Sequence, residues 1–474
     1  MTANLIMYAV AALAVAVVIY MLIKKMDIKI TLFLMGILLI LISVAMGKEI
    51  AVKDFVSTGS ILLDPLQVIV QQFKETFAAA GFVILILGGY TAYMSKIGAN
   101  DVTVSVLTKP ISKFKSVYVL VPVVFLLGNL LSLVIPSASN LAIILLATLF
   151  PVLKRSGMST LTAAAIVATS ATIIPTPLGS DNVAIAQELA KYDMFKNLSV
   201  TDYVFKYHAM VSIPTLLFIA VVHFFWQRRM DKKAAAKGDS AENIQLEKVE
   251  EIQGGKLYKF VYALLPIFPI VLLLAAYAIQ MTTGAAITVS VEVATLVSFI
   301  LAIIAELVRN KGDKKVLSDT EAFFKGMGGA MSIVALLVAA SVFVTGLKSI
   351  GLIDALQQSM EHTQGKGMDF VLPLILVGVT TLIVMLSGSG LALFFAMIPL
   401  VVPLAQAAGI NPIAIAVPMG LAGNLVRAVS PVAAVVLIVA GTVKKDPIDI
   451  VKRTSVPMFA GVVFMFILSM ILFT

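Results

Sequence analysis

A single arginine stands inside a long apolar stretch of this chain. Arg427 has apolar sequence on both sides, over residues 410–443, and Asn424 precedes it. Ser430-Pro431 follows at once, and proline cannot continue the hydrogen-bond ladder of a helix. A charge at membrane depth is costly and normally faces a partner or a water-filled cavity, and a broken helix is tolerated there only in the same surroundings. We therefore predict an anion-binding site at this break, formed by Asn424, Arg427 and Ser430.

A second break carries a carboxylate. Residues 175–182 hold two prolines and a glycine, which free several backbone carbonyls within an apolar span. The carbonyls together with Ser180, Asp181 and Asn182 favour a coupling cation, Na+ or H+, whereas freed amides and the Thr176 hydroxyl suit a carboxylate. The alternatives are a plain loop at the membrane edge and a structural ion pair between Asp181 and the arginine of the other break.

Small polar clusters form a third group of candidates, at the predicted tips of two hairpins. A helix that begins at such a tip points its N-terminal amides at the middle of the membrane, where its dipole favours an anion. The alternative is that small residues permit close helix packing in lipid. The substrate-binding candidates at the tips are Ser137, Ser139, Asn140, Ser387 and Ser389.

The composition is that of a polytopic membrane protein. Of the 474 residues, 60% are hydrophobic and 13% are charged, enough for about ten spans of roughly 20 residues. There is no cysteine, and no His, Asp or Glu cluster has metal-ligand spacing, so we expect no metal cofactor. No P-loop occurs, and no carboxylate pair or nucleophile with a base is present, so neither ATP drive nor an enzyme is expected.

The charges predict the sidedness of the chain. The net charge of +9 lies in loops between apolar runs, which argues against a nucleic-acid partner. When the spans alternate, most of the 35 Lys and Arg residues fall on one side, and the positive-inside rule makes that side cytoplasmic. The linker at 227–257 is then cytoplasmic, and both termini face outward. The basic pairs that set this side include Lys24-Lys25, Lys113 and Lys115, Lys154-Arg155, Lys232-Lys233, Lys314-Lys315 and Lys444-Lys445.

The chain resembles itself at a separation of about 250 residues. Phe73-Lys74 recurs as Phe324-Lys325, and the step Ser212-Ile213-Pro214 recurs as Ser455-Val456-Pro457. We divide the chain into a first repeat at 1–226 and a second repeat at 258–474, joined by the linker.

The two repeats are predicted to be inverted. The hairpin at 115–155 has basic residues at both ends, so it enters from the cytoplasm, whereas the hairpin at 369–408 has almost no basic flank and fits an outward opening. Broken helices follow at 158–188 and 411–443. This is the plan of secondary transporters, and the predicted fold is all-α, with about ten transmembrane helices plus two re-entrant hairpins. The unbroken spans are expected near 4–23, 29–47, 79–96, 206–226, 258–281, 287–308, 329–348 and 455–473, with amphipathic stretches along the interfaces near 64–77 and 316–327.

Two histidines fall at the ends of the span at 206–226. His208 and His223 are interpreted as interface anchors together with Trp226, with a proton relay as the alternative.

Several stretches of the sequence resemble the Dcu type C family of anaerobic four-carbon dicarboxylate transporters, within the wider ion-transporter superfamily. The matching stretches run from end to end of the chain, whereas the hairpin tips keep only the small polar character of the family. The stretches are Ala92–Asp101, Ala147–Val152, His223–Arg228, Asn424-Leu425, Arg427, Ser430-Pro431 and Val451–Pro457.

The resemblance implies exchange, uptake or efflux of succinate, fumarate or malate across a bacterial inner membrane. It also implies a homodimer, and an elevator motion of a transport part against a scaffold. The residues alone leave two other carriers open. One carries a different organic anion, such as a short-chain monocarboxylate or a keto acid, because one arginine suffices for it. The other is a cation/proton antiporter that uses Asp181, with Arg427 as its counter-ion.

Overall fold

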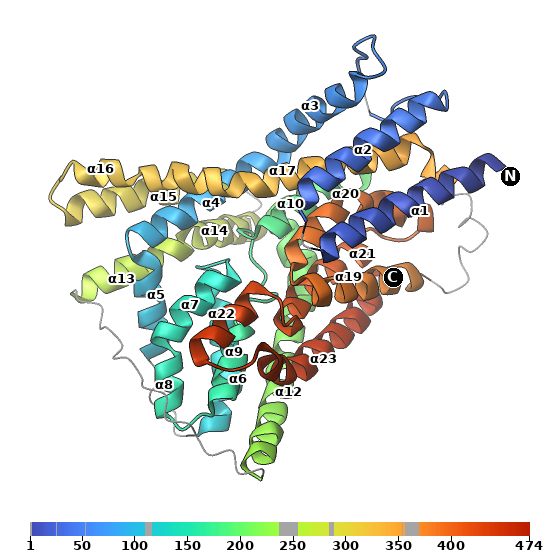
Figure 1. Cartoon of the computed structure of the whole chain (residues 1–474). Coiled ribbons are helices and arrows are strands. Elements are labelled where there is room, and N and C mark those ends of the chain that lie inside the picture. Colours follow the sequence, from blue (N-terminus) through green and yellow to red (C-terminus); the bar gives the residue numbers. More distant parts are fainter. Residues whose placement is uncertain are drawn as a thin grey trace.

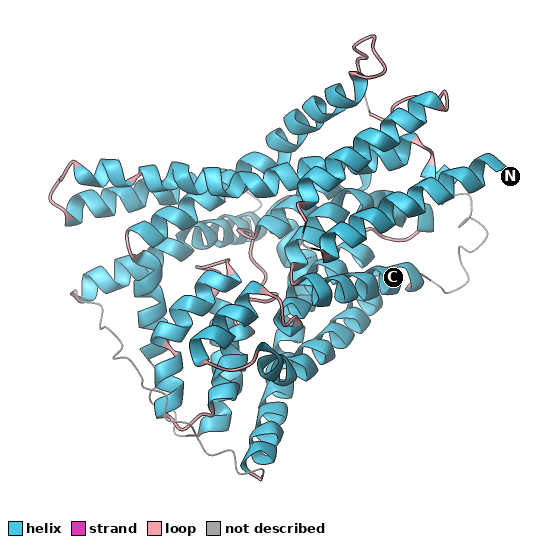
Figure 2. Cartoon of the chain, viewed as in Figure 1, coloured by secondary structure: helices cyan, strands magenta, loops and turns pink. Residues whose placement is uncertain are grey.

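The computed structural model describes residues 2–24, 26–52, 54–109, 116–236, 255–283, 289–352, 354–355 and 369–474. These residues fold into helices joined by loops, with no strand in the described ranges (Figure 2). The all-helical class is therefore confirmed. Lys25, Lys113, Lys115 and most of the 227–257 linker lie outside the described residues.

Within the described ranges, eight helical segments are long and apolar enough to cross a membrane. Helices of this length satisfy their backbone hydrogen bonds internally, and their apolar side chains suit a lipid environment. The chain is thus a multi-pass membrane protein. The segments are Ile28–Ala45, Asp64–Lys96, Val200–Ala235, Lys256–Gln280, Val291–Arg309, Lys315–Ser349, Ile413–Val443 and Pro447–Phe473.

Long helices form a layer along the top of Figure 1. The helix α17 (Glu321–Ser349) crosses both α2 (Ile28–Ala45) and α4 (Phe82–Lys96) in this layer. Glycines allow the close approach: a Cβ on Gly36 would lie 2.9 Å from the backbone of α17, and one on Gly88 would lie 2.6 Å from the Ala330 Cβ. Small residues at helix crossings are the usual means of tight packing in lipid. The helices α1 (Thr2–Ile23) and α15 (Val291–Arg309) pack against α2 and α4, respectively.

The amphipathic stretches predicted near 64–77 and 316–327 are joined closely to the long helices that follow them. The helix α3 (Asp64–Thr76) continues through the π-helical turn η1 (Phe77–Gly81) directly into α4, and α16 (Lys315–Asp319) is separated from α17 by Thr320 alone. No proline or glycine occurs at 66–80 or 315–325, so nothing in the local sequence ends either helix. A π-helical turn adds a residue to a helix without terminating it.

The chain also forms two helical hairpins, each followed along the chain by a broken helix, and the first hairpin lies below this layer in Figure 1. In the first half the elements are α6 (Val117–Leu131), α7 (Ala138–Thr148), α8 (Phe150–Arg155), α9 (Thr160–Ala168) and α10 (Ser180–Leu189). In the second half they are α19 (Val371–Ser387), α20 (Gly390–Ala408), α21 (Ile413–Val426), η6 (Arg427–Val429) and α22 (Ala434–Val443).

The two long helices that close the halves, α12 (Ala209–Ala235) and α23 (Pro447–Phe473), pack along each other. A largely buried ion pair joins them, with Arg453 Nη1 2.6 Å from Asp231 Oδ1. Gln227 Nε2 also donates to the Arg453 carbonyl at 2.9 Å. The other described elements are α5 (Ala99–Thr108), η3 (Asp193–Phe195), α11 (Val200–Tyr203), η4 (Val204–His208), α13 (Lys256–Leu264), η5 (Leu265–Ile267) and α14 (Phe268–Thr283).

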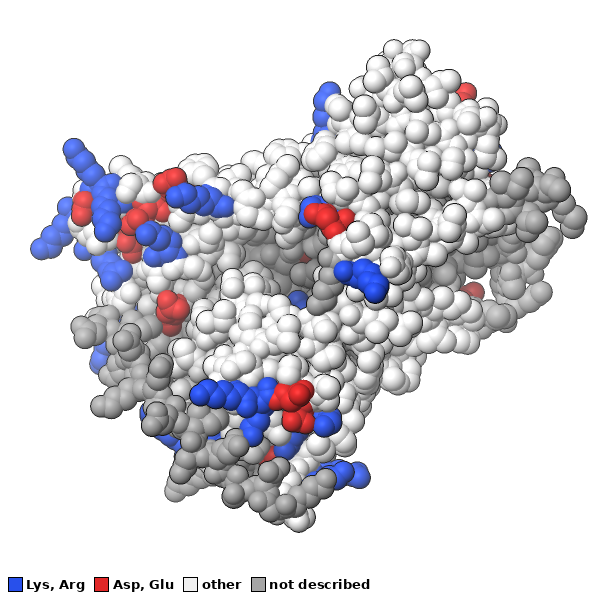
Figure 3. All heavy atoms as spheres, in the orientation of Figure 1, with Lys and Arg blue, Asp and Glu red and all other residues white. Residues whose placement is uncertain are grey.

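Charged side chains are concentrated in a few places on the face that Figure 3 shows. They gather around the turn between α15 and α16, at the left, and in a second group lower on the face. The last turns of α8 and α12 carry Lys154, Arg155, Lys232 and Lys233. Wide areas of the same face carry few charges, as lipid contact requires.

The second hairpin leaves no room for a side chain at its tip. A Cβ on Gly390, the first residue of α20, would overlap the carbonyl of Gly423 on α21. We expect Gly390→Ala to destabilise the fold by about 1–3 kcal/mol, because overpacking forces the two backbones apart. The measurement is the midpoint of thermal unfolding in detergent. Gly378→Ala on α19 is the matched control, since a Cβ there meets nothing within 4 Å. Equal midpoints for Gly390→Ala and the wild type would contradict this packing.

Candidate functional site

The first break, between α9 and α10, leaves carbonyls without helical partners, and side chains bind three of them. Asn129 Nδ2 donates to the Thr169 carbonyl at 3.1 Å, and Asn182 Nδ2 donates to the Thr176 carbonyl at 2.9 Å. The third donor, Arg427 Nη2, comes from the other half of the chain and binds the Ala171 carbonyl. Paired carbonyls make the irregular segment 169–179 tolerable within an apolar fold, because unpaired buried groups are costly.

Asn129 is the residue of the first break that sequence reasoning missed. Its side chain is fully buried on α6, and its Oδ1 also accepts from the Thr172 amide at 3.0 Å and from the Thr172 hydroxyl at 2.7 Å. The preceding Gly128 packs on Ser170 so closely that a Cβ would overlap that side chain. A lone Asn after a Gly in an otherwise apolar hairpin helix was the available signal.

The second break is fastened to its neighbours by hydroxyls. Ser430 is fully buried, and its Oγ donates to the Met385 carbonyl on α19 at 2.8 Å. Thr454 Oγ1 on α23 donates to the Ala428 carbonyl at 2.7 Å. The Ser430 side chain thus connects the second break to the second hairpin.

The two breaks meet through two hydrogen bonds. Arg427 Nη2 donates to the Ala171 carbonyl at 2.5 Å, and Asn424 Nδ2 donates to Asp181 Oδ2 at 2.9 Å. Asp181 Oδ1 also accepts from the Asn182 amide at 3.0 Å. In the described structure, no carboxylate oxygen of Asp181 lies within 4.0 Å of a guanidinium nitrogen of Arg427. The carboxylate accepts a hydrogen bond from the Asn424 side-chain amide instead.

A small cavity lies between the breaks. Its volume of about 70 Å³ is enough for several water molecules. Six predicted site residues line it: Thr176, Ser180, Asp181, Asn182, Asn424 and Arg427. The other lining residues are Ser132, Pro136, Ala171, Thr172, Ile173, Ile174, Gly179 and His208.

The polar residues predicted at the hairpin tips are not among those lining this cavity. Ser137 caps α7 by accepting from the Asn140 amide at 3.4 Å, and Ser387 Oγ accepts from the Ser389 amide at 3.3 Å. Ser139 is partly buried on the first turn of α7. The tip of the first hairpin reaches the cavity through Ser132 and Pro136.

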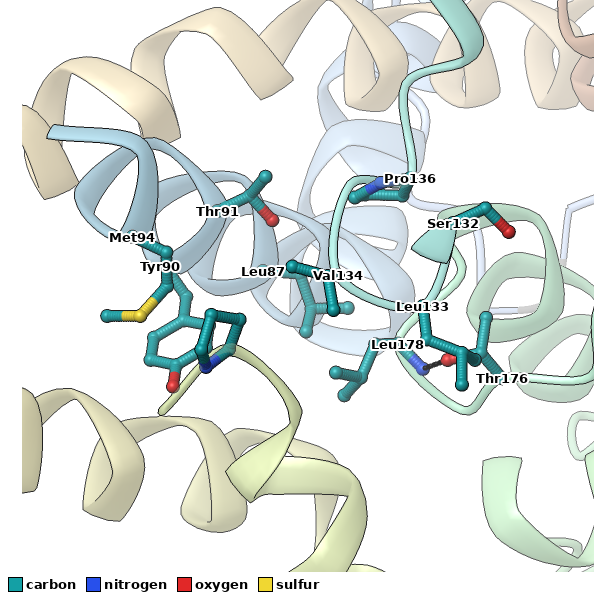
Figure 4. Close-up of a pocket in the computed structure, with 11 residues that line it drawn as sticks. Leu87, Tyr90, Thr91, Met94, Ser132, Leu133, Val134, Pro136, Thr176 and Leu178 are labelled. Atoms are coloured by element: carbon teal, nitrogen blue, oxygen red, sulfur yellow. Dashed lines mark hydrogen bonds between the residues drawn. The ribbon is translucent and has the colours of Figure 1, made fainter. Parts of the chain in front are cut away.

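A neighbouring pocket separates the first hairpin from the upper layer (Figure 4). It shares Ser132, Pro136 and Thr176 with the site cavity. Figure 4 shows the hairpin loop and the first break on one side of it and α4 on the other. Its remaining lining residues are Leu87, Tyr90, Thr91, Met94, Leu133, Val134, Leu178 and Pro266.

The interpretation of both histidines as interface anchors is wrong, because both are buried. His208 is 5% exposed and lines the site cavity. His223 is fully buried, 3.3 Å from Gln227 Nε2 and 3.4 Å from Thr169 Oγ1, with its ring against Phe125. These side chains lie on the packed face of the helix, whereas Trp226 stays partly exposed and donates to the Lys452 carbonyl at 3.2 Å.

The cavity therefore combines one guanidinium, one carboxylate, one imidazole, two amides and hydroxyl groups. A guanidinium binds both oxygens of a carboxylate at once, and amide and hydroxyl donors complete the coordination of an anion. Within the described residues no group of three or more His, Asp or Glu side chains is arranged to hold a metal ion. These groups are of the kinds that bind a small organic anion.

Solved structures show the same fold. The crystal structure of the Alcanivorax borkumensis YdaH transporter matches with a TM-score of 0.66 at 15% identity, over 94% of this chain and 98% of that chain. The Neisseria gonorrhoeae MtrF structure, described in its title among antimetabolite efflux pumps, matches with a TM-score of 0.61 at 15% identity, over 93% of this chain and 94% of that one. At this identity the likeness concerns the fold alone.

Sequence comparison gives the family. The anaerobic C4-dicarboxylate transporter DcuC of Escherichia coli K12 is 36% identical over 433 residues, which cover 91% of this chain and 89% of that protein. The protein of Vibrio cholerae named a probable anaerobic C4-dicarboxylate transporter DcuC is 34% identical over 439 residues, covering 92% and 91%. The profile of the family described as C4-dicarboxylate anaerobic carrier matches residues 5–474. This chain therefore belongs to the DcuC family of C4-dicarboxylate anaerobic carriers, which are transporters and not enzymes.

Proposed function

We propose that this chain carries C4-dicarboxylates such as succinate, fumarate and malate across the bacterial inner membrane, by exchange, uptake or efflux, and that it binds them in the cavity between the two breaks. The observation that carries the proposal is the position of Arg427. Its guanidinium lines a cavity where two broken helices meet, in a chain of a dicarboxylate carrier family. Sites of this kind near broken helices are the common plan of secondary transporters.

Arg427 has donors to spare for a substrate. Within the described residues, its guanidinium donates one hydrogen bond, from Nη2 to the Ala171 carbonyl. A guanidinium carries several N–H donors in a planar fork, so the others remain for a carboxylate. Asn424 and Thr176 line the same cavity and supply an amide and a hydroxyl beside it.

The coupling cation, Na+ or H+, is proposed to bind at the start of α10. Asp181 provides the carboxylate there, with Ser180 and Asn182 on either side of it in the cavity wall. The Asn424 bond to Asp181 Oδ2 links this group to the helix that carries Arg427, so binding at one break is transmitted to the other.

The hairpin tips remain part of the proposal for a different stage of transport. In an elevator motion, the hairpins and broken helices move together as the transport part, against a scaffold made of the upper layer. Each of the two inverted repeats contributes helices to both parts. The pocket between the first hairpin and α4 lies at this boundary and supports the division. Ser137, Ser139, Asn140, Ser387 and Ser389 then contact substrate when a hairpin opens. A homodimer joined through the scaffold follows from the family resemblance.

Uptake by proteoliposomes tests the proposal directly. Purified protein is expected to take up labelled succinate in a saturable way, faster when the vesicles contain unlabelled succinate. A preference for short monocarboxylates over succinate would favour the second candidate, a monocarboxylate carrier, which the single guanidinium at the site also suits. No uptake of either class by folded protein would refute an organic-anion carrier.

We predict that Arg427→Lys keeps the fold and lowers succinate uptake at least tenfold, a loss of about 1.4 kcal/mol or more. Lysine keeps the charge but lacks the planar fork that binds two carboxylate oxygens. The measurement is initial uptake per amount of reconstituted protein, with the exposed Arg229→Lys on α12 as the control. Uptake equal to that of the control would show that Arg427 serves only as a counter-charge.

The predicted sidedness has a clean test, because the chain contains no cysteine. Lys233→Cys at the end of α12 is expected to resist an impermeant thiol reagent in intact cells, and Thr282→Cys at the end of α14 is expected to react, since the basic linker is proposed to be cytoplasmic. Both termini then face the periplasm. Labelling of position 233 but not of position 282 would invert this topology.

A further inference from the structure

The charges in the cavity do not balance a dicarboxylate. A C4-dicarboxylate brings two negative charges, and Arg427 supplies one positive charge, which Asp181 already offsets when it is ionised. The third ionisable side chain in the lining is His208. A buried negative charge without a matching positive charge is strongly unfavourable.

His208 occupies an unusual position for a structural histidine. It ends the π-helical turn η4, is 5% exposed, and lines the cavity together with Asp181 and Arg427. Its Nδ1 is buried without a hydrogen-bond partner among the described residues, and the same holds for Ser212 Oγ four residues later. A buried histidine that only fills space normally has its ring nitrogens paired, as His223 does through Gln227 and Thr169.

We propose that His208 is the proton-binding residue of the site and supplies its second positive charge. When the substrate dianion enters, the neutral imidazole takes up one proton from water, and the imidazolium pairs with the second carboxylate while Arg427 holds the first. The proton leaves with the substrate on the other side of the membrane. This inference rests on the proposed function, assigns the proton to His208 rather than to Asp181, and leaves Na+ as the cation that the start of α10 would bind.

The surroundings leave His208 as the group that responds to the substrate. The elements packed against η4 are α11, α12 and α21. On α11, Asp202 is paired with Lys206 of η4 at 2.7 Å, and the Tyr203 ring lies 6.4 Å from the imidazole. Residues 413–426 of α21 contain no titratable side chain, and the first one after His208 on α12 is His223. Asp181 and Arg427 are thus the charges that share the cavity with it.

The chemistry of the groups favours the imidazole over the carboxylate for this role. Histidine is the side chain whose ordinary titration falls between about pH 5 and 8, and a nearby negative charge favours its protonated form. Protonation of Asp181 would also remove a negative charge, but its two oxygens already accept from Asn424 and from the Asn182 amide. Imidazole protonation therefore offsets the arriving charge without breaking either bond.

Calorimetry measures the proton directly. Fumarate, both of whose carboxyl groups are ionised between about pH 6 and 8, is titrated into the purified full-length protein in buffers of different ionisation enthalpy. The wild type is expected to take up close to one proton per fumarate bound. His208→Gln is expected to take up almost none and to bind at least tenfold more weakly at pH 6. Asp181→Asn is expected to retain the proton uptake, and Ser212→Ala, outside the cavity lining, serves as the control.

The outcomes distinguish failure of the proposed function from failure of the role proposed for His208. Wild-type protein that binds neither fumarate nor succinate would refute the proposed function. Wild-type binding without proton uptake, or equal uptake by His208→Gln and the wild type, would overturn the role of His208 and leave the proposed function standing. If His208→Gln and His208→Asn both fail to fold, infrared difference spectra of wild-type protein with isotope-labelled histidine decide. An imidazolium band that appears with fumarate supports the role, and its absence overturns it.

Discussion

The constraint on which this structure depends is that two helices break inside an apolar fold, where every freed carbonyl needs a donor. The donors come from other parts of the chain. Arg427 in the second break binds the Ala171 carbonyl of the first, and Asn129 on the first hairpin binds the Thr169 carbonyl. Because unpaired backbone groups are expensive where water is scarce, these bonds fix the breaks side by side. Arg427 and Asn182, two of the side chains that satisfy the breaks, thereby line one cavity together with Asn424 and Asp181.

The side chains that stabilise the breaks are also the ones proposed to bind substrate. Arg427 holds a carbonyl in this structure, yet a guanidinium has further donors, so the residue that stabilises the break can also bind a carboxylate. Asp181 is likewise held by Asn424, and both side chains line the cavity. In a carrier, a site held together by its own polar groups when empty can exchange some of those bonds for bonds to substrate. The close glycine contact between Gly390 and Gly423 keeps the second hairpin against the helix that carries Arg427.

Much of this site could be predicted from the sequence, and the limits have physical reasons. Proline and glycine act through local backbone geometry, so the breaks that carry Thr176, Asp181 and Arg427 are visible in the chain, and those residues line one cavity. The direction in which a helical side chain points is not visible in a membrane protein, because lipid and core are equally apolar and the usual periodicity is lost. The position of His208 at the end of a span therefore predicts an interface anchor, and the sequence does not show that Asn129 faces the first break. The roles predicted for the hairpin tips depend on how far the hairpins open.

The central claim is that a dicarboxylate binds between the two breaks with one carboxylate on Arg427. The most direct test is an electron-microscopy map of the purified protein with bound succinate. The account predicts ligand density in the cavity between η6 and the start of α10, with one carboxylate within hydrogen-bonding distance of both Arg427 and Asn424. Well-defined succinate density outside this cavity, with the Arg427 guanidinium making no contact to it, would contradict the account.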